Sequence, residues 1–146
     1  MTDSPPDVLA SRLGYLFKQA HARLLDVAGP AMAPFGIDGR ELAVLAVLGA
    51  GAPLSQQEAA ELLGVDRTTM VALVDELERK ELVERHRSAA DRRKNIVRLT
   101  EKGRRCLEGA GDARDAAERR FLEPLGESGA AGFVAALQIL AGARPL

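Results

Sequence analysis

The sequence has few of the residues that build catalytic, metal or disulfide sites. Its 146 residues include one cysteine, Cys106, two histidines, His21 and His86, and no tryptophan. A single cysteine excludes an intramolecular disulfide, and two histidines leave too few ligands for a zinc site. No nucleophile–base pair and no glycine-rich phosphate loop is visible. We therefore expect neither an enzyme nor a bound metal or cofactor.

Long apolar runs and aromatic residues are also scarce. No stretch of about 18 apolar residues occurs, so no membrane-spanning helix is predicted. Residues 1–7 lack the basic and then apolar pattern of a signal peptide, and we expect a cytoplasmic, nucleoid-associated protein. With four Phe and one Tyr among 47% hydrophobic residues, the core must consist of Leu, Val and Ala. That composition favours helices over a sandwich or barrel.

The charges are strongly segregated along the chain. Residues 85–105 hold nine Lys and Arg against two Asp and Glu, a net charge of +7, and since the whole chain carries −1, the remainder carries −8. Such a basic segment can attract a polyanion to one face, although charged segments are more often only solvated turns.

Apolar spacing and capping residues predict the helices. Steps of three and four over residues 7–29 predict a first helix that Asp7 begins and Gly29-Pro30 ends. A second helix begins at Asp38. Two further helices, 56–63 and 67–80, begin at Ser55 and Asp66, with Gly64 in the turn between them; such a pair is a helix-turn-helix.

After the helix-turn-helix the period changes to that of strands. Residues 82–86 and 96–100 predict two strands, and the polar segment between them predicts a loop. Thr100 then begins a further helix, and Pro124 begins the last. A helix-turn-helix followed by a charged hairpin indicates a mainly helical, winged helix-turn-helix fold.

This order of elements explains the basic segment as a DNA-binding surface. The second helix of the motif enters the major groove by its N-terminal end, where Arg67, Thr68 and Thr69 can reach base edges or phosphates, although capping of the helix would also account for them. Arginines of the hairpin loop fit a narrow minor groove. We expect the Asp91 carboxylate to hold one of their guanidinium groups in a fixed pose.

Two segments carry a family resemblance. The wing, with Leu82-Val83-Glu84-Arg85, Asp91-Arg92-Arg93 and Val97-Arg98-Leu99-Thr100-Glu101-Lys102-Gly103, resembles that of the MarR family of bacterial transcription regulators. The run from Leu54 to Thr69 is similar to the helix-turn-helix of the same family. The family usually has glycine where this chain has Glu81, so Glu81 must adopt a left-handed conformation or the turn must differ.

The resemblance implies a single domain, 1–146, that works as a homodimer. Residues 7–29 and 101–143 would be dimerisation helices, and 38–100 the winged lobe, with the wing at about 82–100. The implied function is that of a repressor on a pseudo-palindromic double-stranded operator. The implied DNA contacts are Ser55, Arg67, Thr68, Thr69, Arg85, Arg87, Asp91, Arg92, Arg93 and Lys94.

Two further expectations concern regulation. In relatives, a pocket takes small aromatic acids, and Tyr15, His21 and Arg23 are the candidate contacts here for a small aromatic or lipophilic effector. A lone Cys106 in an alanine-rich helix is more often a small buried filler than an oxidant sensor. The rival to operator binding is a winged-helix module for protein contact, like an antirepressor, which would have a neutral or acidic wing.

Overall fold

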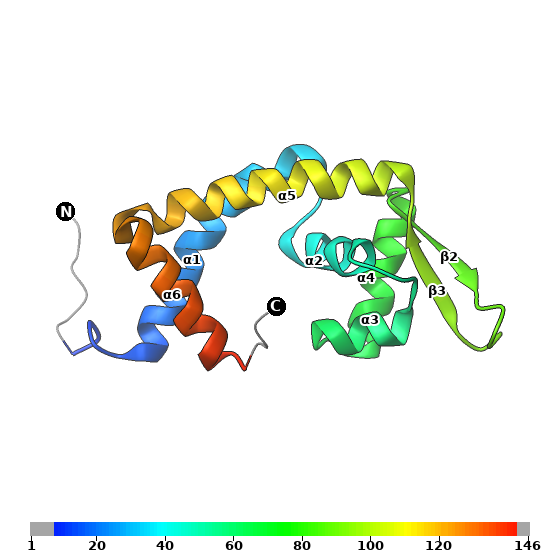
Figure 1. The fold of residues 1–146 in the computed structure, drawn as a ribbon, viewed down its shortest axis with the longest axis horizontal. Coiled ribbons are helices and arrows are strands. Elements are labelled where there is room, and N and C mark those ends of the chain that lie inside the picture. Colours follow the sequence, from blue (N-terminus) through cyan, green and yellow to red (C-terminus); the bar gives the residue numbers. More distant parts are fainter. Residues whose placement is uncertain (1–7, 143–146) are drawn as a thin grey trace. The chain divides into compact units, whose positions relative to one another are not determined.

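The computed structural model describes residues 8–142, which form two compact units (Figure 1). The first unit comprises residues 8–28 and 115–142, and the second comprises residues 29–114. The mainly helical prediction is confirmed. No helix within the described residues is long and apolar enough to cross a membrane.

The first helix, α1, spans Leu13–Met32 rather than residues 7–29. Residues 8–11 form a turn, and Asp7 lies outside the described residues. The prediction that Gly29-Pro30 ends this helix was wrong, because Pro30 lies inside it. Proline inside a helix loses one backbone hydrogen bond and crowds the carbonyl of the residue four positions before it, and here α1 ends two residues after Pro30. The chain leaves α1 through the short 3₁₀ helix η1, Ala33–Phe35.

The second unit is built around the predicted helix-turn-helix. It contains α2 (Gly39–Gly49), α3 (Gln56–Leu63) and α4 (Arg67–Arg79). Asp38 and Glu41 form the capping box of α2, with the Glu41 N–H donating to Oδ1 of Asp38 at 2.9 Å. The core of this unit is aliphatic, as predicted, and its largest fully buried side chains are Leu42, Val44, Leu45, Met70, Val74, Leu77, Val83 and Val97.

The wing is an antiparallel hairpin of β2 (Val83–Arg87) and β3 (Asn95–Leu99), each within one residue of its predicted bounds. A third strand, β1 (Leu54–Ser55), pairs with β3 and gives the sheet order β1-β3-β2. The sequence did not predict β1, because two residues are too few to show a strand period.

The connection from α4 to β2 confirms the expected left-handed residue. Glu81 has a φ of 62°, and it is the only non-glycine residue with positive φ in the described chain. The Thr100 hydroxyl donates to the carbonyl oxygen of Glu81 at 2.7 Å and accepts from the N–H of Gly103 at 3.0 Å. Thr100 therefore begins α5 (Glu101–Leu122), as predicted, and also fixes the Glu81 turn.

The last helix of the described residues is α6 (Gly126–Leu140). Pro124 does not begin it, contrary to the prediction. Instead, Pro124 lies in the 3₁₀ helix η2 (Glu123–Leu125), and Gly126 has a φ of 71°. With a ψ of 171°, this backbone conformation lies outside the right-handed helical region, so η2 ends here and α6 begins at Gly126.

Candidate nucleic-acid interface

Local capping interactions position the two helices of the motif. The hydroxyl of Ser55 accepts the N–H of Glu58 at 3.1 Å and donates to Oε1 of Glu58 at 3.0 Å. Gly64 ends α3 with a φ of 65°. Asp66 begins α4 by accepting the Thr69 N–H at 2.7 Å, and this N–H, followed by the Thr69 hydroxyl, holds the pKa of Asp66 below its usual range.

The start of α4 is exposed, while its later turns are anchored in the core. Met70, Val74 and Leu77 are buried, and they fix the orientation of the helix. Arg67 and Thr68 are exposed in the first turn, whereas Thr69 is partly buried beside its cap. The first turn of α4 is therefore free to enter a groove of DNA by its N-terminal end.

The loop of the wing is shaped by Asp91. Oδ1 of Asp91 accepts the backbone N–H of Arg93 at 3.0 Å, and the carbonyl oxygen of Asp91 accepts the N–H of Lys94 at 3.0 Å. The Ser88 hydroxyl also accepts the N–H of Asp91 at 3.3 Å. The prediction that Asp91 holds a guanidinium group was wrong: its carboxylate folds the main chain into an Asx turn, which is a common use of a short carboxylate in a loop.

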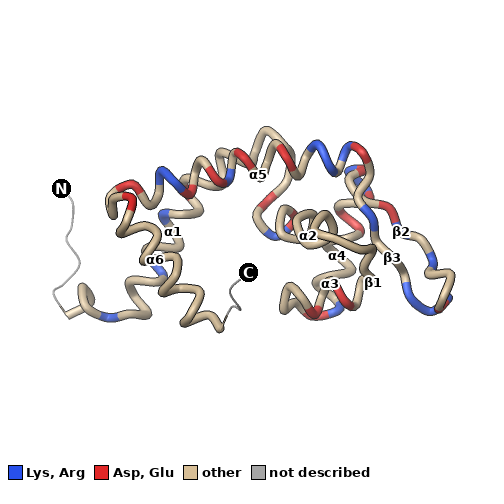
Figure 2. Tube along the Cα trace, in the orientation of Figure 1, with Lys and Arg blue, Asp and Glu red and all other residues tan. Residues whose placement is uncertain are grey.

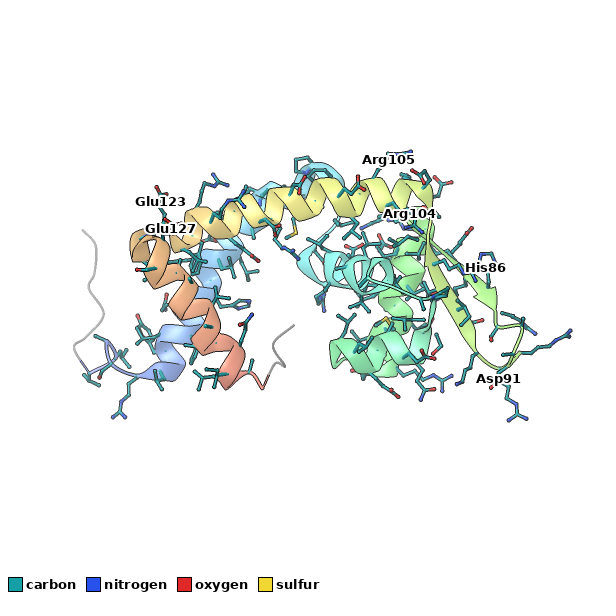
Figure 3. All side chains as sticks on the ribbon, in the orientation of Figure 1. His86, Asp91, Arg104, Arg105, Glu123 and Glu127 are labelled. Carbon is teal, nitrogen blue, oxygen red and sulfur yellow. The ribbon has the colours of Figure 1, made fainter. Side chains whose placement is uncertain are left out.

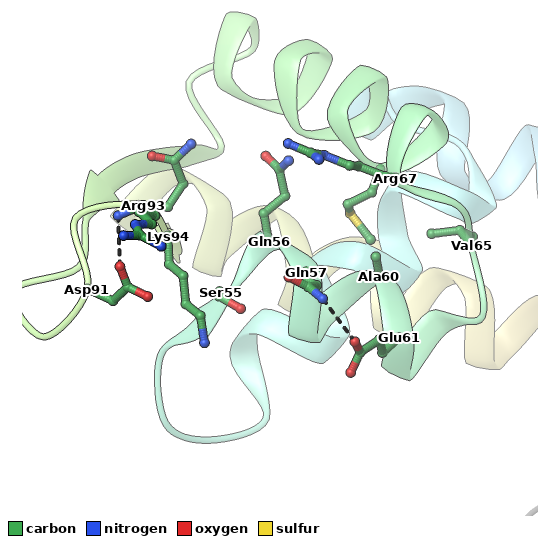
Figure 4. Close-up of a pocket in the computed structure, with 12 residues that line it drawn as sticks. Ser55, Gln56, Gln57, Ala60, Glu61, Val65, Arg67, Asp91, Arg93 and Lys94 are labelled. Atoms are coloured by element: carbon green, nitrogen blue, oxygen red, sulfur yellow. Dashed lines mark hydrogen bonds between the residues drawn. The ribbon is translucent and has the colours of Figure 1, made fainter.

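A groove of about 580 Å³ separates the start of α4, the recognition helix of the motif, from the tip of the wing. Figure 4 shows Arg67 on one side of the groove and Arg93 and Lys94 on the other. Buried Met70 and Ala60 contribute to its lining. The cationic groups stand on both walls and outnumber the acidic Glu61 and Asp91 of the lining, which suits a polyanion that lies along the groove.

The predicted contact residues differ in how available they are. The side chains of Arg67, Thr68, Arg87, Asp91, Arg92, Arg93 and Lys94 are exposed. Ser55 is only 2% exposed, and its hydroxyl makes the two bonds to Glu58 described above. The guanidinium of Arg85 contacts Asp75 and Glu78 within the protein. Ser55 and Arg85 therefore do not offer a free side chain to DNA.

The groove also contains polar residues that the sequence analysis did not select. Gln56 and Gln57 lie on the first turn of α3, and Asn95 begins β3. The amide of Gln57 donates to Glu61 at 3.4 Å (Figure 4). The sequence did contain a signal for Gln56 and Gln57. The first helix of a helix-turn-helix crosses the DNA backbone, and these two residues form its first turn, directly after the Ser55 cap.

Within residues 85–105, two groups of basic residues lie outside the strands β2 and β3 (Figure 2). One group lies on the wing loop. The other lies in the first turns of α5, and Figure 3 shows its members Arg104 and Arg105 at the opposite end of the hairpin from Asp91. The charge of +7 in residues 85–105 is therefore divided in space, and the groove uses only its wing part.

The regulatory candidates are placed as follows. Tyr15, His21 and Arg23 lie on α1, with Tyr15 partly buried and the other two exposed.

Cys106 lies on α5 with Sγ 3.9 Å from the carbonyl oxygen of Phe35, and burial raises the pKa of its thiol. A thiol with a raised pKa is a poor nucleophile at neutral pH.

Known proteins resemble the chain in sequence and in structure. The sequence profile of the MarR family matches residues 35–94. The transcriptional repressor NicR of Pseudomonas putida is 30% identical over 106 residues, which are 73% of this chain and 67% of that protein.

Two solved structures of the repressor CouR cover nearly the whole chain. CouR bound to a 23-mer DNA duplex is 33% identical, with a TM-score of 0.89 over 96% of this chain and 99% of that one. CouR from Rhodococcus jostii RHA1 bound to p-coumaroyl-CoA is 28% identical, with a TM-score of 0.80 over 97% and 99%.

Proposed function

Because the chain belongs to the MarR family, it is a DNA-binding regulator of transcription, and we propose that it is a dimeric repressor of a pseudo-palindromic operator. In this proposal the start of α4 reads the major groove and the wing loop enters the adjacent minor groove. The protein would act in the cytoplasm on the DNA of the nucleoid.

The groove between α4 and the wing carries this proposal. A DNA backbone separates the major groove from the minor groove, so a protein that reads both must leave room for one strand of phosphates. The groove of about 580 Å³ provides that room between Arg67 and the pair Arg93 and Lys94. The structure of CouR bound to a DNA duplex supports duplex DNA as the partner.

The exposed residues divide by chemistry. Arg67 and Thr68 are suited to base edges, since arginine can donate two hydrogen bonds to guanine. Arg92 and Arg93 are suited to the minor groove, and Arg87 and Lys94 to phosphates. Ser55 acts within the protein as the cap of α3, Asp91 shapes the wing loop, and Arg85 links elements. The N–H of Thr69 binds Asp66, the cap of α4.

The first unit is proposed to form the dimer. Among its described residues, apolar side chains are widely exposed, including Leu13 at 71%, Ile139 at 79% and Leu140 at 75%. Exposed apolar surface of this extent marks an interaction site. The surface lies within the segments proposed for dimerisation, 7–29 and 101–143, and MarR regulators are dimers. A two-fold dimer would place two α4 helices on half-sites about 10 bp apart.

We assign the release from DNA to a small aromatic or lipophilic effector. The complex of CouR with p-coumaroyl-CoA supports this class of ligand. Tyr15, His21 and Arg23 on α1 are the candidate contacts, of which His21 and Arg23 could meet a carboxylate. Such a ligand must favour a spacing of the two α4 helices that does not match the half-sites, and tenfold weaker DNA binding requires about 1.4 kcal/mol of coupling.

A gel-shift series over salt concentration tests operator binding. The probes are the intergenic DNA beside the gene and an unrelated duplex. We expect Arg93→Ala to weaken operator binding by about 1–3 kcal/mol, whereas Arg104→Ala, with the same change in charge at the far end of the hairpin, should have a much smaller effect. Equal affinities of Arg93→Ala and the parent protein would refute the role of the wing. Failure of the parent to bind any DNA would favour the antirepressor-like alternative.

A further inference from the structure

Acidic groups of the recognition helix hold the guanidinium of a wing residue. Arg85 lies on β2, with Nη2 2.7 Å from Oδ1 of Asp75 and Nη1 3.3 Å from Oε1 of Glu78, both on α4. The second carboxylate oxygen of Glu78 accepts the backbone N–H of Arg85 at 3.2 Å. Glu78 therefore binds both the main chain and the side chain of one wing residue.

The same guanidinium also reaches the first helix of the motif. Nε of Arg85 donates to Oε1 of Gln56 on α3 at 3.2 Å, and Nη2 donates to the carbonyl oxygen of Val71 on α4 at 3.5 Å. The side chain of Arg85 is 20% exposed. One residue thus connects the wing to both helices, and its donors point into the protein rather than toward a phosphate.

We propose that Arg85 is a positioning residue for operator binding, which fixes the wing against α4 so that Arg67 and Arg93 reach their grooves together. This inference rests on the proposed function and changes the role expected for Arg85 from a DNA contact to an internal link. Two contact elements held in one arrangement bind with less loss of conformational freedom than two that move independently. Loss of the link should therefore weaken operator binding without removing a DNA contact.

The link also orients a residue of the groove. The amide oxygen of Gln56 accepts from Arg85, so the amide NH₂ is the group that Gln56 can offer to the groove that it lines. An NH₂ group donates to a phosphate oxygen, whereas a carbonyl oxygen would repel it. Arg85 thereby also selects the rotamer of Gln56 that suits a polyanion.

The substitution Arg85→Met tests the proposal, because it keeps the length of the side chain and removes its donors. Binding is measured by fluorescence anisotropy between about 50 and 200 mM salt, on a duplex recovered by repeated selection from a random pool and on an unrelated duplex. We expect about tenfold weaker binding to the selected duplex, unchanged binding to the unrelated one, and an unchanged slope of log affinity against log salt.

Arg87→Met is the matched control on the same strand. Arg87 is exposed and is assigned to a phosphate, so its loss should reduce the salt slope by about 0.9 and weaken both duplexes alike. If Arg85→Met gives that pattern, or if it binds the selected duplex as tightly as the parent, the positioning role is wrong.

Glu78→Gln provides an independent test that does not depend on the fold of Arg85→Met. It removes a negative charge from α4, so a purely electrostatic role predicts tighter binding to both duplexes. The positioning role predicts weaker binding to the selected duplex, and unchanged or tighter binding by Glu78→Gln contradicts it. If the parent recovers no duplex from the pool, the proposed function itself fails, which is a different result.

Discussion

The ammonium of Lys80 lies 2.6 Å from Oε2 of Glu41 and joins the end of α4 to the start of α2. The Glu41 side chain is 8% exposed and that of Lys80 is 23% exposed. Lys80 also donates to the carbonyl oxygen of Gly36 at 2.8 Å. Since Glu41 completes the capping box of α2, this pair fixes the recognition helix against the neighbouring helix of the lobe.

Lys80→Met should lower the free energy of unfolding by about 3 kcal/mol, because it leaves the buried Glu41 carboxylate without its cation. Urea unfolding measures the change. Lys94→Met, at the exposed wing loop, is the control and should stay within about 0.5 kcal/mol of the parent. A loss below about 1 kcal/mol for Lys80→Met would show that the pair is only a surface contact.

The same pair predicts a dependence on alkaline pH. Burial lowers the pKa of Lys80, but the hydrogen bonds and charges of Glu41 and, after it, Glu76 outweigh it, and the pKa lies above the ordinary 10.5. A raised pKa means that the contribution is fully present below pH 10.5 and is lost as pH rises through the folded value. The difference in stability between the parent and Lys80→Met should therefore be constant up to that pH and shrink above it. A difference that shrinks already near neutral pH would contradict the assignment.

Glu81→Gly should stabilise the protein. A non-glycine residue at a φ of 62° costs about 1–2 kcal/mol, and the greater freedom of glycine in the unfolded chain offsets part of the gain. The net increase in the free energy of unfolding should be about 0.5–1 kcal/mol, measured in urea. Gly64→Ala is the reverse case, since Gly64 has a φ of 65° with open space around it, and it should destabilise. Equal stabilities of parent and Glu81→Gly would mean that the turn relieves the strain elsewhere.

Gly103→Ala should severely destabilise the lobe. A Cβ at Gly103 would overlap the carbonyl oxygen of Leu82, which accepts the N–H of Thr100 at 3.1 Å. We expect a loss of about 3 kcal/mol, because the first turn of α5 cannot move without breaking that bond. Gly111→Ala, on the same helix with open space around it, should instead stabilise by up to about 1 kcal/mol. Similar changes in stability for both variants would show that helix propensity, and not the overlap with Leu82, determines the effect of Gly103→Ala.

The sequence predicted best those features that depend on neighbouring residues. The caps Asp38, Ser55 and Asp66 and the left-handed Gly64 each act within a few positions, and each was confirmed. The aliphatic core followed from the composition, because the sequence holds few aromatic residues.

Features that depend on distant segments were missed or misjudged. Strand β1 exists because Leu54 and Ser55 meet Val97 and Ile96 of β3, and no local pattern reports that pairing. Arg85 was assigned to DNA from its place in the basic wing and from the family resemblance, because its partners Asp75 and Glu78 lie on another element. The position of a cation in the sequence does not show whether the fold has already neutralised it.

The last prediction concerns Asp91. Its charge should weaken DNA binding, whereas its hydrogen bond in the wing loop should strengthen DNA binding. A carboxylate in the wing loop repels phosphate, so charge alone predicts that any neutral substitution tightens DNA binding. The Asx turn predicts otherwise for Asp91→Ala, because that variant loses the acceptor for the N–H of Arg93 and with it the shape of the loop. Asp91→Asn keeps an acceptor oxygen and removes the charge. We expect Asp91→Asn to bind operator at least as tightly as the parent and Asp91→Ala to bind about tenfold more weakly, in the same anisotropy assay. Tighter binding by both variants would show that the carboxylate acts through its charge and that the turn forms without it.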